Sequence, residues 1–260
     1  MSSEIVRHLS PEEQELAKKR QELAILQAEL TDREVLLANL RAELVAFEGR
    51  YLREVGVLYA ELDDWNAKIA EFAAKAEDTD DARAAASEAR AQAEESYAAA
   101  HGEAAKAEDF SPSSELKKLF KDVVNQIHPD RAADDADRAL RNRLMAEANA
   151  AYKRQDAAAL RRILEEYTSS PESVKGDGPR ADLQRVLREI ERISRRLTEI
   201  EAEVVGLKSS EIALLMAKVQ TAKAKGRDLL AEMRRDVQNR IDLVRSEFES
   251  RCAKVGDNEQ

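Results

Sequence analysis

The sequence contains very few of the residues that build disulfide frameworks, metal clusters or large aromatic cores. Among 260 residues there are one cysteine, Cys252, and three histidines. A single cysteine excludes an internal disulfide and a cysteine-rich zinc site. Aromatic residues make up 4% of the chain and charged residues 36%, a composition that indicates long exposed helices instead of one large globular core.

Long apolar runs and an excess of basic charge are also missing. No run reaches the roughly 18 apolar residues of a membrane-spanning helix, and the start, MSSEIVRHLSPEEQ, has no apolar signal core. The net charge of −10 disfavours general nucleic-acid binding through phosphate neutralisation. We therefore expect a cytoplasmic protein with no membrane and no nucleic-acid partner.

Catalytic and cofactor-binding patterns are absent as well. None of the eight glycines forms a phosphate-binding loop that opens a helix, and the three histidines are scattered. No nucleophile stands beside a base and an orienting group. The sequence predicts no metal, no cofactor and no enzymatic activity.

A seven-residue apolar repeat fills the first 75 residues. It follows a helix start at Ser10-Pro11, and its members are Leu16, Leu23, Leu30, Leu37, Leu44, Tyr51, Leu58, Trp65 and Phe72. This repeat predicts a coiled-coil helix over 1–75. Around Tyr51 the apolar spacing becomes four and four, which is a stutter that locally unwinds a supercoil.

A second repeat, over 181–255, has steps of four and three from Val186 to Leu207, after which a second stutter follows. When Phe72 is placed opposite Val186 in antiparallel orientation, Tyr51 lies opposite Leu207 and the two stutters coincide. We therefore predict an antiparallel hairpin within one chain. A parallel homodimer, in which each helix pairs with its own copy, is the alternative, and dimerisation of hairpins stays open.

Two connecting segments lie between these repeats. EDTDD, residues 77–81, predicts a helix break, and 76–110 is an alanine- and glutamate-rich segment with high helix propensity and no wide apolar stripe. We expect a solvated or lightly packed connecting helix there. The Ser, Pro and Gly content of 168–180 predicts a linker.

Residues 111–167 contain two amphipathic helices separated by His128-Pro129-Asp130. Ser111-Pro112 provides a capping side chain and a proline for the first helix, and the proline of the tripeptide ends it. The second helix begins near Asp137 and breaks at Gln155-Asp156, before a last helix. The apolar faces predict a core of Leu116, Phe120, Val123, Ile127, Leu144, Ala148 and Tyr152.

This helix, HPD loop, helix arrangement resembles the J-domain of DnaJ-type co-chaperones. LKKLFKDVVNQIHPDR is similar to that family's second helix and loop, and MAEANAAY, Met145 to Tyr152, is similar to the end of its third helix. The resemblance covers about 57 of the 260 residues. The aromatic pair that opens the family's first helix is absent, and Asp122 and Gln126 stand where basic residues are common.

The resemblance implies a co-chaperone whose loop, His128, Pro129 and Asp130, contacts a DnaK-type ATPase chaperone. Lys117, Lys118, Lys121 and Arg131 would form the basic contact face, and the coiled coil would bind or position a protein client that the sequence does not identify. The departures from the pattern favour a second interpretation, a scaffold protein whose J-like module is a plain interaction unit. The expected fold is all-α, a long antiparallel coiled-coil hairpin that carries a small J-domain-like unit.

Overall fold

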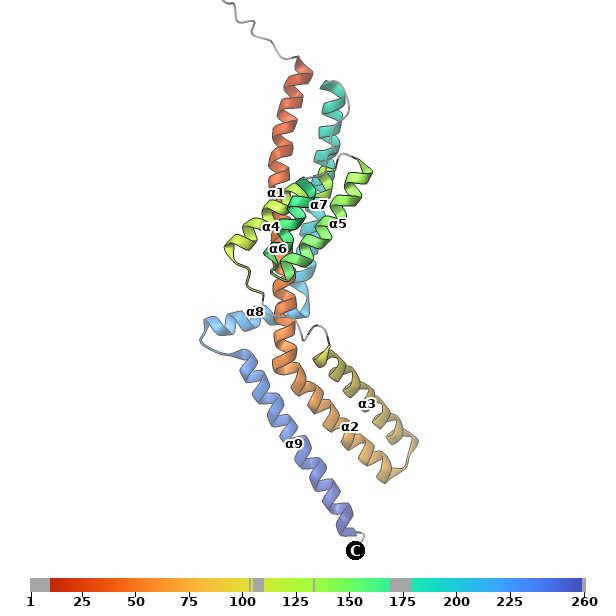
Figure 1. The fold of residues 1–260 in the computed structure, drawn as a ribbon. Helices are drawn as coiled ribbons and strands as arrows, with labels where there is room; N and C mark the ends of the chain where they lie inside the picture. The colour runs from red at the N-terminus through yellow and green to blue at the C-terminus, as the bar shows by residue number, and fades with distance from the viewer. Residues whose placement is uncertain (1–9, 103, 105–109, 133, 169–178, 259–260) are drawn as a thin grey trace, which may run out of the picture. The chain divides into compact units, whose positions relative to one another are not determined.

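The computed structural model describes residues 10–102, 104, 110–132, 134–168 and 179–258, and these residues form helices joined by short turns, with no strand among them. This confirms the all-α class. The linker predicted at 168–180 lies, apart from its ends, outside the described residues. The elements are α1 (Pro11–Tyr51), η1 (Leu52–Gly56), α2 (Val57–Glu77), α3 (Asp80–His101), α4 (Ser114–Ile127), η3 (Pro129–Arg131), α5 (Asp135–Lys153), α6 (Ala157–Thr168), α7 (Pro179–Ser209), α8 (Glu211–Ala224) and α9 (Leu229–Asn258) (Figure 1).

The chain divides into two compact units. The first unit comprises residues 1–42 and 110–208, and the second comprises residues 43–109 and 209–260. Helix α1 contributes its first three quarters to the first unit and its end to the second. Each unit is described separately below.

In the first unit, α1 and α7 pair in the same direction (Figure 1). Four polar pairs join them, and in every pair the two residue numbers differ by 162: Arg20–Asp182, Gln27–Glu189, Glu34–Arg196 and Arg41–Glu203. Since both numbers rise together from pair to pair, the helices are parallel. The predicted antiparallel hairpin is therefore wrong in direction, although the pairing helices belong to one chain.

The apolar interface between α1 and α7 explains why the sequence did not predict that these helices run parallel. Its buried members are Leu16, Leu23, Leu30, Leu37, Val186, Ile193 and Ile200. Alternating steps of three and four look the same whichever way the partner helix runs, so the apolar pattern does not select a direction. The polar residues that flank the interface recur every seven residues, and their opposite charges select the parallel register.

The stutter predicted at Tyr51 coincides with a change of helix type. The chain makes a π-helical turn over Leu52–Gly56, between α1 and α2. A π-turn accommodates an extra residue, so it returns the apolar positions to one face after the change in spacing. Val55, in this turn, is fully buried.

In the second unit, α3 packs antiparallel against α2. Asp78 adopts a left-handed conformation and Thr79 caps α3, so the break predicted at 77–81 is confirmed. Arg90 bonds to Asp64 and Glu71 across the pair. Three alanines one heptad apart, whose small side chains allow close approach of the helices, are buried: Ala86, Ala93 and Ala100. The expectation of a solvated or lightly packed connecting helix thus underestimated its packing.

The C-terminal helix predicted over 181–255 is interrupted twice. Ser210 is extended, and its hydroxyl accepts a hydrogen bond from the Ala213 N–H, which starts α8. Gly226 has a φ of +74°, which glycine adopts without strain, and the chain turns there before α9. Helix α9 then packs against α2, where Phe248 contacts the rings of Trp65 and Phe72.

The first unit also contains a three-helix bundle, here called the HPD unit, made of α4, η3, α5 and α6. The seven predicted core residues all lie in its buried cluster, together with Val124, Ala151, Leu160 and Ile163. Helix α4 begins at Ser114 with Ser113 as its cap, so the cap predicted at Ser111 is two residues too early. Asp134 caps α5 through the Asp137 N–H at 2.8 Å, and this helix begins at Asp135.

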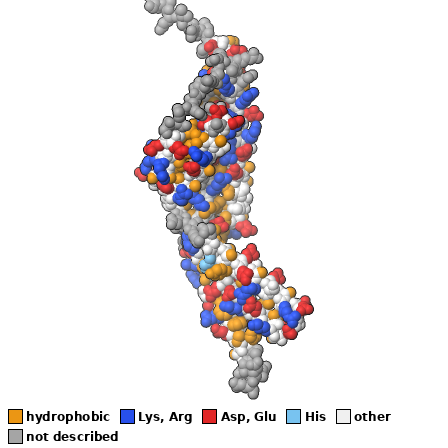
Figure 2. All heavy atoms as spheres, turned by 45° about the vertical axis from the view of Figure 1, so that its right-hand side comes forward, with side chains coloured by type: hydrophobic (Ala, Val, Ile, Leu, Met, Phe, Trp, Pro, Cys, Tyr) orange, Lys and Arg blue, Asp and Glu red, His pale blue; other side chains and the backbone are white. Residues whose placement is uncertain are grey.

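The charges visible on the molecular surface are mixed. Figure 2 shows Lys and Arg side chains interspersed with Asp and Glu over the described part of the face in view. None of the described helices is long and apolar enough to cross a membrane.

Candidate functional site

The HPD loop is positioned by an aromatic stack inside the HPD unit. Phe120 of α4 and Tyr152 of α5 stack with ring centroids 4.1 Å apart and ring planes 10° apart. Phe110 contacts the edge of Tyr152 at 5.5 Å. Since both stacked residues are buried, α4 and α5 are fixed against each other, and this sets where the chain must turn between them.

The loop itself adopts one hydrogen-bonded conformation. Pro129 disfavours helix at His128, and Pro129–Arg131 form a single 3₁₀ turn in which the Arg131 N–H donates to the His128 carbonyl at 3.0 Å. The Asp130 N–H donates to His128 Nδ1 at 3.2 Å. Because Nδ1 is an acceptor here, the neutral imidazole carries its hydrogen on Nε2.

Arg141 of α5 holds this loop in place through hydrogen bonds to its backbone, and the sequence analysis did not predict this role. Its Nη1 donates to the carbonyls of Gln126 at 3.0 Å and His128 at 3.2 Å, which are backbone acceptors left without a helical partner at the end of α4. Its Nε donates to both carboxylate oxygens of Asp137 at 2.9 Å, and its guanidinium lies 4.8 Å from the centre of the Tyr167 ring. The signal in the sequence was an Asp and an Arg four residues apart on α5.

His128 does not face solvent. Only 3% of its side chain is exposed, and Nε2 lies 3.4 Å from Glu34 Oε1 on α1. The same carboxylate oxygen accepts a hydrogen bond from Arg196 Nε of α7 at 2.8 Å. The three residues His128, Glu34 and Arg196, here called the Glu34 cluster, join the HPD loop to both helices of the coiled coil.

The charges of the Glu34 cluster stabilise the ionised carboxylate. Burial raises the pKa of Glu34, but the hydrogen bonds from His128 and Arg196, together with the charge of Arg196, outweigh burial and leave the pKa below its ordinary value of 4.5. Burial alone would lower the pKa of Arg196, yet its bonds to Glu34 and Glu203 raise it overall. Glu34 is therefore an anion held between two donors.

Further contacts attach the HPD unit to one face of α1. Lys121 of α4 forms an ion pair with Asp32, and the Tyr152 hydroxyl donates to Asn39 Oδ1 at 2.7 Å. Val35 and Ala38 pack against the core of the HPD unit. From Asp32 to Val35, and from Val35 to Ala38 and Asn39, the steps are three or four positions, so these residues form a face of α1 distinct from the leucine positions that meet α7.

The residues predicted to contact a partner are distributed unevenly. Lys117 and Lys118 are exposed on α4, whereas Lys121 is bonded to α1. Arg131 is half-buried and donates to the Asn125 carbonyl; burial lowers its pKa. Asp130 Oδ2 is buried without a hydrogen bond, 3.9 Å from His128 Nδ1. The structure thus places Arg131 next to the HPD tripeptide, engages Lys121 with α1 and leaves Lys117 and Lys118 exposed on the helix that leads to the loop.

Comparison of the chain with protein-family models, with curated proteins and with solved structures finds no significant match.

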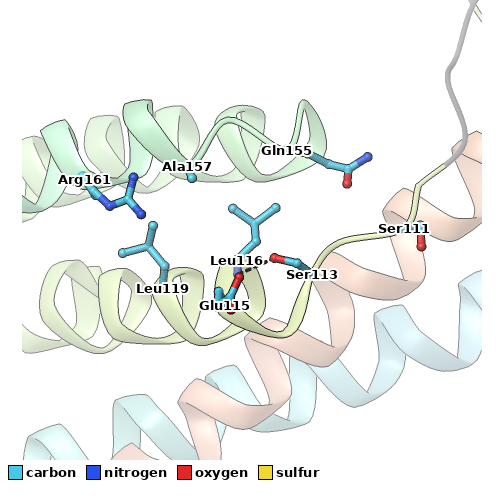
Figure 3. A pocket seen from close by; sticks show the side chains of 8 residues that line it. All are labelled: Ser111, Ser113, Glu115, Leu116, Leu119, Gln155, Ala157 and Arg161. Atoms are coloured by element: carbon cyan, nitrogen blue, oxygen red, sulfur yellow. Dashed lines mark hydrogen bonds between the residues drawn. The ribbon is translucent and has the colours of Figure 1, made fainter.

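A cavity of about 270 Å³ lies elsewhere in the HPD unit, between the starts of α4 and α6 (Figure 3). Its lining includes Leu116 and Leu119 beside the charged Glu115 and Arg161. Ser113 is turned toward its own helix, where its hydroxyl accepts a hydrogen bond from the Leu116 N–H at 3.1 Å. No group of three or more metal-ligating side chains occurs among the residues that the structure describes.

Proposed function

We propose that the chain is a J-domain-type co-chaperone that engages a DnaK-type ATPase through His128, Pro129 and Asp130. The observation that carries this proposal is the position and the fixed conformation of the tripeptide. It follows α4 directly in a closely packed three-helix unit, and Arg141 holds its backbone in one conformation. A preorganised loop of this kind is suited to recognition because little conformational entropy is lost on binding.

The exposed lysines of α4 support an electrostatic role in association. Lys117 and Lys118 extend from the same helix that ends at the loop, and they lie on its exposed face. Positive charges beside a contact loop accelerate encounter with an acidic partner surface. The coiled coil then binds or positions a protein client, and the protein acts without an active site of its own.

A scaffold role is the second candidate, and a specific observation favours it. His128, which would be the central contact residue of a co-chaperone, is buried against Glu34 of the same chain. In the scaffold interpretation this histidine serves only to attach the HPD unit to the coiled coil.

Single-turnover ATP hydrolysis by a DnaK-type ATPase separates the two functions. The full chain is compared with His128→Gln, and the matched control is His101→Gln, which changes an exposed histidine of α3. Glu34→Ala is included because His128 is buried in the wild type. Stimulation that His128→Gln removes and His101→Gln preserves supports the co-chaperone. If neither the wild type nor Glu34→Ala accelerates hydrolysis, the scaffold role replaces it.

A further inference from the structure

The contacts of the HPD unit with α1 use the same side chains that the proposed function assigns to a partner. His128 faces Glu34, and Lys121 forms an ion pair with Asp32. Both α1 residues are carboxylates, so this helix presents negative charge to the loop and to the basic helix beside it. With only 3% of the His128 side chain exposed, a partner has no access to the imidazole in this arrangement.

The attachment is made of polar contacts around a small apolar patch. Val35 and Ala38 are the α1 residues that pack against the core of the HPD unit, and both are modest in size. The polar contacts are His128 with Glu34, Lys121 with Asp32, and Tyr152 with Asn39. Polar contacts exchange readily for contacts with water, so such an attachment is more easily reversed than a large apolar interface.

The attached state also leaves one polar atom unsatisfied. Asp130 Oδ2 is buried and has no hydrogen bond, although Asp130 belongs to the tripeptide of the candidate site. A buried carboxylate oxygen without a donor is unfavourable relative to one exposed to water or bonded to a partner. This cost lowers the free energy needed to release the loop.

We propose that the coiled coil regulates the HPD unit by autoinhibition: α1 covers His128 of the partner-binding loop through Glu34 and holds Lys121 of α4 through Asp32, and the HPD unit must detach before the ATPase binds. This inference rests on the proposed function. Arg196 couples the contact to the coiled coil, because it orients the Glu34 carboxylate that receives His128. Separation of α1 from α7, for instance when a client binds the coiled coil, would weaken the contact with His128.

Histidine accessibility tests the attachment without any ATPase. The full chain is treated with diethyl pyrocarbonate, and modification of His128 and His101 is followed by mass spectrometry; His101 is exposed and serves as the internal reference. In the wild type, His128 is expected to react at least about tenfold more slowly than His101. Loss of a charge-assisted hydrogen bond in Glu34→Ala is expected to accelerate His128 by about tenfold.

Two variants control for indirect effects. Glu29→Ala removes an exposed carboxylate from the same helix, where it pairs with Arg33, and is expected to leave His128 protected. The double change Asp32→Ala with Asn39→Ala removes contacts with Lys121 and Tyr152 and keeps the Glu34–Arg196 pair of the coiled coil. It is expected to expose His128 even if Glu34→Ala disturbs the coiled coil.

The same proteins are then assayed for stimulation of a DnaK-type ATPase. The proposal expects the exposed variants to stimulate at about tenfold lower concentration than the wild type and Glu29→Ala. Rapid modification of His128 in the wild type overturns the attachment. Exposed variants that stimulate no better than an active wild type overturn the autoinhibition and leave the co-chaperone function standing. A protected His128 with no stimulation by any variant overturns the proposed function, and autoinhibition with it.

Discussion

Replacing Arg141 with alanine is expected to destabilise the HPD unit by removing the side chain that holds its loop. The Arg141 side chain is 10% exposed and its partner Asp137 is 11% exposed, so this pair is largely removed from water. Removing one partner of a buried ion pair costs about 3–5 kcal/mol. The same change removes the donor to the carbonyls of Gln126 and His128.

Hydrogen exchange measures this cost locally. A loss of about 3–5 kcal/mol corresponds to exchange that is roughly 10² to 4 × 10³ times faster for amides protected by opening of the HPD unit. Peptides covering α4, the loop and α5 are followed by mass spectrometry in the full chain. Peptides from α9, in the second unit, serve as the reference within each sample.

Arg143→Ala is the matched control, because Arg143 lies on the same helix but its side chain is 58% exposed. Its ion pairs with Glu147 and Glu166 are surface pairs, which contribute about 0–1 kcal/mol, so exchange is expected to change less than about tenfold. Equal exchange in the two variants would refute the role of Arg141 in holding the loop.

Three further predictions follow from the two units. Leu26→Cys with Ile193→Cys, in a Cys252→Ser background, is expected to form a disulfide within one chain under dilute oxidation; only interchain products, seen by gel mobility, would contradict the parallel register. The pKa of Glu34 is lowered in the folded protein, so the wild type is expected to have a larger free energy of unfolding than Glu34→Gln above pH 4.5. This difference is expected to disappear as the pH falls through the lowered pKa, and a pH-independent difference in urea titrations would contradict this. Ala93→Leu overfills the α2–α3 contact and is expected to destabilise the second unit by about 1–3 kcal/mol in thermal unfolding, whereas an unchanged midpoint would contradict close packing there.

Apolar spacing was sufficient to predict that the chain is helical and which side chains share the core of the HPD unit, but it did not predict the breaks at Ser210 and Gly226. Phe120 and Tyr152 recur at helical steps in their segments, and both lie in the core of the HPD unit. The stutter at Tyr51 marked the position of the π-turn, because a helix can only keep its apolar face through such a change by altering its winding. Structural features that depend on the local spacing of apolar residues could therefore be predicted from the sequence.

The direction of pairing could not be read from apolar spacing, since Leu30 fits a parallel and an antiparallel partner equally. The flanking residues carry that information, and Arg20, Glu34 and Arg41 each meet a complementary residue at a constant offset. Burial of His128 was also not predictable. A histidine in a polar loop gives no local sign of a contact with a residue 94 positions earlier in the chain.

The most direct test of the account is single-turnover ATP hydrolysis by a DnaK-type ATPase in the presence of Glu34→Ala and of the double variant Glu34→Ala with His128→Gln. The first change exposes the loop, so a missing response is not explained by burial of His128. The account predicts that Glu34→Ala accelerates hydrolysis more strongly than the wild type and that the added His128→Gln abolishes the acceleration. Equal rates with the single and the double variant would contradict it.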